Sequence, residues 1–271
     1  MISSPSNPRL KEIARLREGK HRRRTGCCLI DGRREIERAF HCGVRILELF
    51  ATEEFHLFPG VPTTLVAESV FGKIAFGDRN DGILAVAETP QKSLDSLPTI
   101  ALPLLAVLEG VEKPGNVGAV FRSADGAGMD GILVTDPATD LFNPNTIRSS
   151  LGTIFKVPTA VTESCAAFDW LRQHGIHLAV ARCDGAIPYT DYDFRPPTAI
   201  VLGSEADGLS SIWNGPGTTA ISLPMHGIAD SLNVSTAAAV LFYEARRQRE
   251  RDTTQRHQTA FLPSTPPKGE S

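Results

Sequence analysis

The sequence predicts an α/β protein with two domains, of which the C-terminal one contains a mostly parallel sheet. Three observations support this prediction. Short apolar segments alternate with segments of helical periodicity, which is typical of strand-helix-strand units with parallel strands. The length of 271 residues exceeds that of most single domains. A segment with Pro90, Pro98 and Pro103, and Ser and Thr between them, separates two alternating regions.

Residues 1–92 are expected to form a small α/β domain. Its first helix is predicted over residues 7–24, because Pro8 suits the first turn of a helix and Leu10 and Ile13 lie near one side of it. Apolar runs and helical spacing then alternate. The expected elements are strands at 27–30 and 44–51 around a helix at 31–42, then apolar runs at 65–66 and 83–87.

Residues 103–249 are expected to form the second domain, after a linker at 93–102. Residues 250–271 are polar and then rich in proline, too poor in apolar side chains to pack, so they are predicted to be a disordered tail. The elements expected in the second domain are strands at 104–108, 131–135, 177–181, 199–202 and 219–223 and helices at 117–127, 165–174 and 233–248.

Positive charge is concentrated at the N-terminal end. The whole chain has a formal net charge of −3, but residues 1–50 contain 12 Lys and Arg against 6 Asp and Glu. A basic end on a nearly neutral protein is the pattern expected where one surface meets phosphates. The candidates for RNA contact are Lys20, Arg22, Arg23 and Arg24, and a solvated helix face is the alternative.

Composition also excludes several classes of protein. The chain has no run of eighteen apolar residues and no signal-peptide pattern, so a soluble, cytoplasmic protein without a membrane partner is expected. The five cysteines are odd in number and lack the C-x-x-C spacing of a zinc site. They are interpreted as reduced thiols, and no metal is expected.

Three short segments carry candidate chemistry, each after a predicted strand. In the first, residues 109–122, a Gly-rich turn opens a helix with Asn116 and Arg122, but the glycine spacing fits neither a dinucleotide fingerprint nor a P-loop. In the second, residues 201–210, Gly203 and Glu205 follow an apolar strand, where ligands of open α/β sheets bind. A plain structural turn is the alternative for each.

The third segment, residues 221–233, joins a strand to the start of a helix. Ser231 or Asn233 is a suitable N-cap for that helix, and capping is the simplest role for both. The helix that follows is rich in alanine and apolar on most sides, so it is expected to be buried. It could be buried within the domain or in an interface between subunits.

Together the three segments resemble the three motifs of the SpoU or TrmH-like RNA methyltransferases, within the SPOUT superfamily. Residues 102–248 carry this resemblance, and residues 3–90 resemble more loosely the ribosomal-protein-like substrate-binding domain that often precedes it. The matching motifs, in order, are Asn116-Val117-Gly118 with Arg122, Gly203-Ser204-Glu205 with Gly208-Leu209, and Leu223-Pro224-Met225 with Ser231-Leu232-Asn233-Val234.

The resemblance implies a methyl transfer from S-adenosylmethionine to a ribose 2'-hydroxyl in tRNA or ribosomal RNA. A 23S-type ribosomal RNA is the expected substrate, with tRNA as second choice, because a separate basic N-terminal domain suits a large folded target. The resemblance also implies a SPOUT-type α/β knot fold and a homodimer. Arg122 corresponds to the arginine proposed as catalytic base in the family; a grip on phosphate or on the developing charge explains it equally well, since a guanidinium stays protonated. By resemblance, cofactor contacts fall at Gly203, Leu223 and Leu232, and orienting roles at Asn116, Glu205, Ser231 and Asn233.

Two positions depart from the family pattern. Glu112-Lys113 precedes Pro114 where the family has Asp or Asn, and His226 lies in a loop that commonly holds a small or apolar residue. His226 is interpreted as a loop histidine rather than a catalyst. A non-catalytic RNA-binding or ribosome-assembly protein that kept the fold is the alternative function, and methylation that blocks an antibiotic site is a third.

Overall fold

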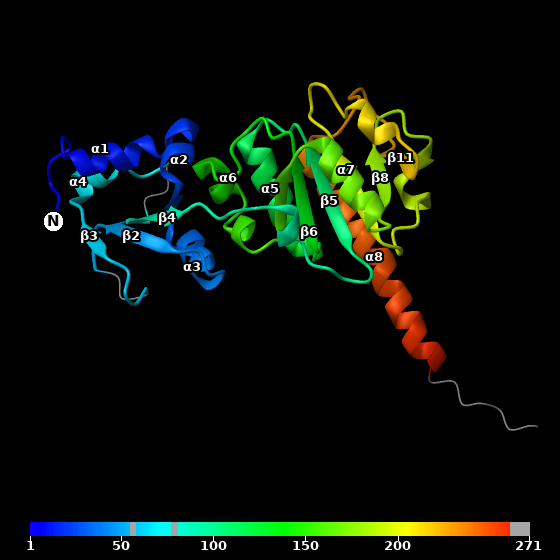
Figure 1. Ribbon diagram of the computed structural model, residues 1–271, viewed down its shortest axis with the longest axis horizontal. Helices are drawn as coiled ribbons and strands as arrows, with labels where there is room; N and C mark the ends of the chain where they lie inside the picture. Colours follow the sequence, from blue (N-terminus) through cyan, green and yellow to red (C-terminus); the bar gives the residue numbers. More distant parts are fainter. Residues whose placement is uncertain (55–57, 77–80, 261–271) are drawn as a thin grey trace, which may run out of the picture.

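The computed structural model describes residues 1–54, 58–76 and 81–260, and it confirms the predicted α/β class. Figure 1 shows two bodies side by side, joined by an extended segment. Each body has its own sheet, one of four strands and one of seven. The seven-stranded sheet lies in the C-terminal half, as the alternation of apolar and helical segments predicted.

The N-terminal sheet has the strand order β1-β4-β2-β3. β4 pairs antiparallel with both of its neighbours, and β3 pairs parallel with β2. Leu29, Phe50 and Leu84 are buried among the helices that cover one face. The elements are α1 (Pro8–Arg15), α2 (Gly19–Thr25), β1 (Cys27–Asp31), α3 (Arg33–His41), β2 (Ile46–Ala51), β3 (Thr63–Leu65), α4 (Glu68–Phe71) and β4 (Ile83–Glu88).

The C-terminal sheet has the order β7-β6-β5-β10-β8-β11-β9, and each neighbouring pair is parallel. All its strands therefore end at one edge, and the loops that leave those ends lie together. The strands are β5 (Leu104–Glu109), β6 (Gly131–Thr135), β7 (Thr159–Thr162), β8 (His177–Ala181), β9 (Ile187–Pro188), β10 (Thr198–Leu202) and β11 (Thr218–Ser222).

Helices cover both faces of this sheet. In β5, Leu104, Ala106 and Leu108 join one core with α5 (Pro114–Ala127) and α8 (Val234–Ala260), and Leu105 and Val107 join another with α7 (Ser164–Gln173). Successive side chains of a strand point to opposite faces, so a strand covered on both faces is apolar throughout. This explains why the central strands appear in the sequence as continuous apolar runs.

Gly118 is needed for packing between helices. A Cβ atom at this position would fall on the hydroxyl of Ser149 and close to the carbonyl of Thr146, both in α6 (Pro144–Ser149). The absence of a side chain therefore lets α6 lie directly against α5. The glycine of the first motif thus serves the fold of the helix pair rather than contact with a ligand.

Several elements differ from the sequence predictions. The helix predicted over 7–24 is divided into α1 and α2, because the guanidinium of Arg22 folds back and donates to the carbonyls of Leu16 and Arg17 between them. The sequence analysis also missed α6, β7 and β9, which are short. The resemblance also implies a knot, in which one segment of the chain passes through a loop formed by another. The order of the strands does not define such a passage, so the knot stays a prediction.

The C-terminal end of the chain is helical for longer than expected. α8 continues to Ala260, beyond residue 250 where the tail was predicted to begin, and the remaining predicted tail, 261–271, lies outside the described residues. An established helix adds each further turn at little cost, even where the sequence is polar. Across the described residues, none of the helices is long and apolar enough to cross a membrane.

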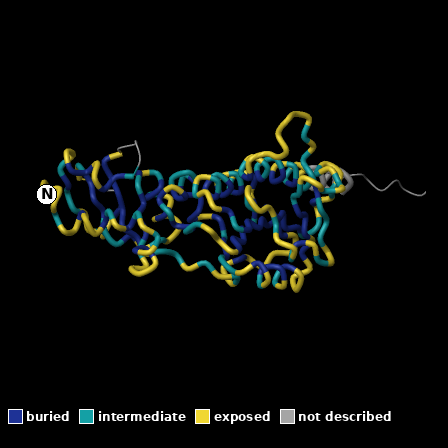
Figure 2. The backbone as a smooth tube through the Cα atoms, turned by 90° about the horizontal axis from the view of Figure 1, so that it is seen from above, coloured by how far each residue is buried: buried dark blue, intermediate teal, exposed yellow. Residues whose placement is uncertain are grey.

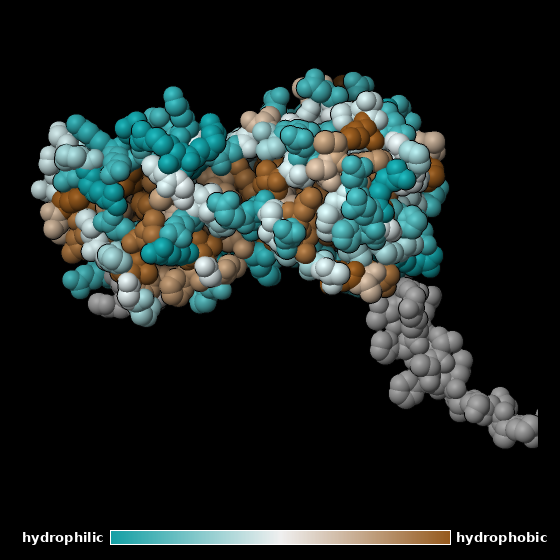
Figure 3. Space-filling view, in the orientation of Figure 1, coloured by the Kyte–Doolittle hydropathy of each residue, from teal (hydrophilic) through white to brown (hydrophobic). Residues whose placement is uncertain are grey.

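The two bodies share a packed interface. One hydrophobic core includes Cys28 and Ile36 from the N-terminal sheet and its helix as well as Phe142 and Ile154 from the C-terminal body. In Figure 3 apolar residues are visible at the waist between the two lobes. The interface also contains polar contacts, in which Arg38 donates to the carbonyl of Leu151 and Arg148 to that of Phe76.

Arg22 forms the ion pair of this interface. Its side chain is 3% exposed, and Nε lies 2.8 Å from Oδ2 of Asp140, which belongs to the C-terminal body. The prediction that Arg22 contacts RNA therefore needs correction, because a buried and paired guanidinium is not available to a phosphate. The sequence could not separate it from its exposed neighbours, since the pairing depends on a residue more than a hundred positions away.

We predict that Asp140→Asn destabilises the protein, because it leaves the buried guanidinium of Arg22 without a counter-charge. Such a loss costs up to about 3 kcal/mol. Chemical denaturation would measure it. The matched control is Asp125→Asn, which removes an exposed ion pair with Lys156 and should cost less than about 1 kcal/mol. Equal effects of the two substitutions would contradict a stabilising role for the Arg22–Asp140 pair.

Candidate active site

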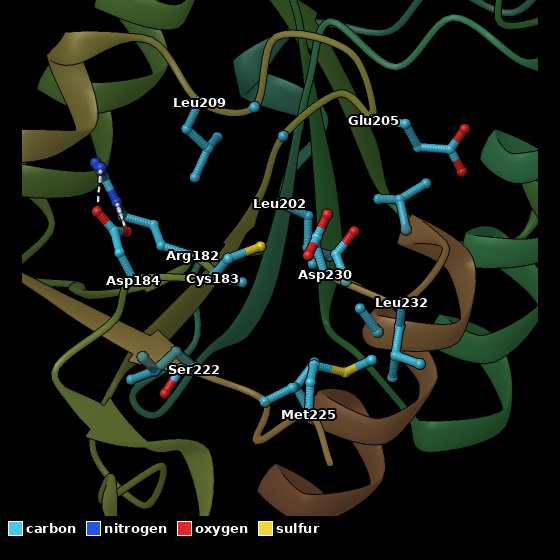
Figure 4. A pocket seen from close by; sticks show the side chains of 18 of the residues that line it. Arg182, Cys183, Asp184, Leu202, Glu205, Leu209, Ser222, Met225, Asp230 and Leu232 are labelled. Carbon is cyan, nitrogen blue, oxygen red and sulfur yellow. Dashed lines mark hydrogen bonds and ion pairs between the residues drawn. The ribbon is translucent and has the colours of Figure 1, made fainter. Parts of the chain in front are cut away.

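A cavity of about 560 Å³ lies at the carboxyl-terminal edge of the C-terminal sheet. Loops that follow three neighbouring strands, β8, β10 and β11, form its walls, together with the start of α8. Figure 4 shows these loops around the cavity, with side chains from each of them directed inward. The size and the position are those of a small-molecule site in an open α/β sheet.

The loop after β10 is a tight return of the chain. Ser204 and Gly208 exchange two backbone hydrogen bonds of 3.2 Å, and the Ser204 hydroxyl accepts from the backbone N–H of Asp207. A Cβ atom at Gly203 would overlap the backbone of Gly208, so only glycine fits at the start of the return. This places backbone, rather than a side chain, against the cavity.

All three residues predicted to contact the cofactor, Gly203, Leu223 and Leu232, line this cavity. Gly203 comes from the loop after β10, and Leu223 and Leu232 come from the two ends of the loop between β11 and α8. An aromatic ring or an aliphatic chain would find apolar contacts here. The other apolar side chains of the wall include Leu202, Leu209, Ile221, Met225, Val234 and Leu241.

The charged groups of the wall are mostly carboxylates. Asp184, Glu205, Asp207 and Asp230 line the cavity, and Arg182 is the one cation of the wall among the described residues. Arg182 is already engaged: its Nε lies 2.9 Å from Asp184, and Nη1 donates to the side chain of Asn214 over 2.7 Å. The cavity therefore favours a ligand with net positive charge.

Glu205 joins the three motif segments. Its Oε1 accepts hydrogen bonds from Nδ2 of Asn116 (3.0 Å) and Nδ2 of Asn233 (2.5 Å). Its Oε2 pairs with the ammonium of Lys113 at 2.5 Å. Asn233 also caps α8, since its Oδ1 accepts from the backbone N–H of Ser235. The capping role expected for Asn233 and its place in the site are thus compatible.

These contacts set the charge of Glu205. The hydrogen bond from Lys113 is the largest cause that lowers the pKa of the Glu205 carboxyl, with a smaller contribution from Asn116. The same contact raises the pKa of the Lys113 ammonium. Glu205 is therefore an anion with most of its acceptor positions in use, which suits the holding of loops better than the removal of a proton.

Other predicted residues lie around this centre. Ser231 lines the cavity, whereas Arg122 is exposed on α5 and does not line it. Arg122 has no hydrogen-bond partner among the residues that the structure describes. His226 is exposed in the loop before α8, outside the cavity wall, as expected for a loop histidine. Lys20, Arg23 and Arg24 are exposed on α2, in the other body.

The sequence analysis missed several residues of the site. Lys113 was noted only as a departure from the family pattern, yet it pairs with Glu205. Arg182 and Asp184 follow β8, and only their place directly after an apolar strand could have marked them. In the portion of the chain that is described, no cluster of three or more His, Cys, Asp or Glu is arranged to hold a metal ion.

Comparison with known proteins identifies the family. The model of the SpoU rRNA Methylase family matches residues 103–243, and that of the MRM3-like substrate binding domain matches residues 7–85. A 23S rRNA (uridine(2479)-2'-O)-methyltransferase from Streptomyces viridochromogenes is 32% identical over 230 residues, which cover 82% of this chain and 75% of the relative.

Solved structures agree with this match. A crystal structure of an RNA 2'-O ribose methyltransferase has a TM-score of 0.82 and 38% identity, over 92% of this chain and 99% of the other. That of an AdoMet-bound rRNA methyltransferase from Sinorhizobium meliloti has a TM-score of 0.85 and 27% identity, over 91% and 97%. The chain therefore belongs to the SpoU rRNA methylase family, whose motifs its three segments resemble.

Proposed function

We propose that this protein transfers a methyl group from S-adenosylmethionine to a ribose 2'-hydroxyl of large-subunit ribosomal RNA. The observation that carries the proposal is the junction of Asn116, Glu205 and Asn233 beside a cavity at the carboxyl edge of the sheet. Its relatives include named 23S rRNA 2'-O-methyltransferases. Transfer RNA is the second choice of substrate, because other relatives are named tRNA/rRNA methyltransferases.

The cavity fits the cofactor in size and in charge. S-adenosylmethionine carries a sulfonium and an ammonium. Of the four wall carboxylates, Asp184 and Glu205 are paired with Arg182 and Lys113, and Asp207 and Asp230 complement the positive charge of the cofactor. The apolar wall near Leu223 and Leu232 suits the adenine ring. When bound, the cofactor supplies an electrophilic methyl group. The contribution of the chain is to hold this group and the ribose oxygen in line.

Arg122 is the residue that we propose to act on the reacting oxygen. Its guanidinium stays protonated, so stabilisation of charge that develops on the 2'-oxygen, or contact with the neighbouring phosphate, is the physically consistent role. Asn116, Glu205, Ser231 and Asn233 orient the ribose and the methionine end of the cofactor. Glu205 does so indirectly, by holding the two asparagines.

The position of Arg122 favours a homodimer with shared sites. It lies on the exposed side of α5 and does not line the cavity of its own chain, so it fits the cavity of a second copy better. Tyr243 of α8 is also exposed, and its hydroxyl lies next to Gly126 of α5. The outer face of these two packed helices is the surface that we propose for dimer contact.

We propose that residues 1–92 bind the RNA, that residues 103–249 carry out methyl transfer, and that the cytoplasm is the site of action. Lys20, Arg23 and Arg24 are exposed on α2. In Figure 3 hydrophilic residues gather over α1 and α2, and in Figure 1 α2 and the loops of the cavity lie at the same upper edge. One bound RNA can therefore span both.

The proposed reaction predicts a specific modification in cells. Mapping of 2'-O-methyl groups in total RNA from cells with and without the gene should show a position in large-subunit rRNA that loses its methyl group. The purified protein with S-adenosylmethionine should restore it on rRNA from the deletion strain. No difference in any RNA would contradict the proposal and favour the non-catalytic RNA-binding alternative.

Arg122→Ala should lower kcat about 10²- to 10³-fold, as loss of one charge-stabilising donor does. Cofactor affinity, measured by calorimetry, should stay unchanged, because Arg122 does not line the cavity. The control is Arg172→Ala, an exposed arginine on α7, which should retain wild-type turnover. Wild-type turnover in Arg122→Ala would remove this residue from the mechanism.

The same variant tests the shared site. Leu232→Arg, which adds bulk and positive charge to the cavity, should be inactive because it excludes the cofactor. Co-expression of Arg122→Ala with Leu232→Arg should restore about a quarter of wild-type activity, since half of the dimers then carry one complete site. No recovery in purified mixed dimers would place Arg122 in the site of its own chain.

The triple variant of Lys20, Arg23 and Arg24 to Ala should bind rRNA more weakly, with cofactor affinity unchanged. The slope of log affinity against log salt concentration should fall by up to about three, one for each lost phosphate contact. Filter binding at several salt concentrations measures this slope. An unchanged slope would exclude α2 from the RNA-binding surface.

A further inference from the structure

A buried carboxylate lies beneath the cavity, outside its wall. Glu109 is the last residue of β5 and the one charged residue in an otherwise apolar strand. It is 6% exposed, and it does not line the cavity. A buried charge needs partners, since its removal from water is costly. The partners of Glu109 therefore indicate what the carboxylate is for.

Three donors converge on this carboxylate. Oε1 accepts from the hydroxyls of Ser164 (2.6 Å) and Ser210 (2.7 Å), and Oε2 accepts from the backbone N–H of Ser210 (2.7 Å). Burial alone would raise the pKa of Glu109, but the hydrogen bonds from Ser164 and Ser210, with a smaller contribution from Trp213, outweigh it, and the pKa is lowered. Glu109 is thus an anion held by two serines.

The contact with Ser210 controls the far end of the loop after β10. Residues 203–209 line the cavity with Gly203, Glu205 and Leu209, and Ser210 directly follows them. The near end is fixed because it continues β10, whereas the far end is exposed at Ser210. Figure 4 shows Glu205 and Leu209 on the two limbs of this loop.

Ser210 also supports a second wall of the cavity. It is the N-cap of η4 (Ser211–Asn214), a 3-10 helix. The side chain of Asn214, at the other end of η4, accepts a hydrogen bond from Arg182 in the cavity wall. Anchoring of Ser210 therefore influences both the loop after β10 and the loop after β8.

We propose that Glu109 is a positioning residue for cofactor binding, which acts through Ser210 to hold the loop of residues 203–209 in its binding conformation. This proposal rests on the proposed function, because it assigns the ligand of the cavity. The contact with Ser164, the first residue of α7, ties the same carboxylate to a helix outside the cavity wall. Loss of the Ser210 contact should therefore affect cofactor binding, whereas loss of the Ser164 contact should affect only the stability of the fold.

The experiment compares Ser210→Ala with Ser164→Ala, two variants that each remove one hydroxyl from the same carboxylate. Calorimetry with S-adenosylmethionine gives Kd, thermal unfolding gives stability, and turnover at saturating cofactor gives kcat. Ser210→Ala should raise Kd about tenfold, the typical effect of losing a hydrogen bond to a charged group. Ser164→Ala should lose similar stability but keep the wild-type Kd, and kcat should change less than about twofold in both variants.

Glu109→Gln provides an independent test. Its amide presents an NH₂ group where acceptors are required, so it should raise Kd at least as much as Ser210→Ala does, again with little change in kcat. Equal increases of Kd in the two serine variants, or none in Ser210→Ala, would overturn the positioning role. Failure of the wild-type protein to bind S-adenosylmethionine would instead overturn the proposed function, and the inference with it.

Discussion

The carboxylate of Glu205 is the point at which the three motif segments meet. Asn116 lies in the first turn of α5, Glu205 follows β10 and Asn233 precedes α8, so the three residues are far apart in the sequence. One anion with several acceptor positions can hold both amides and the Lys113 ammonium at once. This junction ties the start of α5 and the start of α8 to the loop after β10 at the rim of the cavity.

Two carboxylates contact the loop after β10 in different surroundings, one within the loop and one beneath its far end. Glu205 is at the solvent side, where its charge is offset by Lys113, and Glu109 is buried beneath the far end of the loop. Both have a lowered pKa because they accept hydrogen bonds from positioned donors. Figure 2 shows buried backbone inside the molecule and exposed backbone along its outside, and Glu205 and Ser210 are both among the exposed residues.

The interface between the two bodies combines a shared hydrophobic core with the buried pair of Arg22 and Asp140. An ion pair of this kind favours one arrangement of the two bodies, since any other arrangement would leave the guanidinium of Arg22 buried without a partner. The basic surface of α2 is thereby kept in a defined place relative to the cavity. In the proposed function, with α2 bound to RNA, this relation would set which nucleotide reaches the site.

The sequence by itself determined the α/β class, the three motif segments and the family, because strand and helix periodicity and short motifs are local properties. It also indicated that Gly203, Leu223 and Leu232 belong to one site, through the resemblance. Only the tertiary structure showed that Arg22 is buried, that Arg122 does not line the cavity of its own chain, and that Lys113 contacts Glu205 and Glu109 contacts Ser210. These properties depend on partners distant in the chain, and no local pattern encodes which side chains folding brings within hydrogen-bond distance.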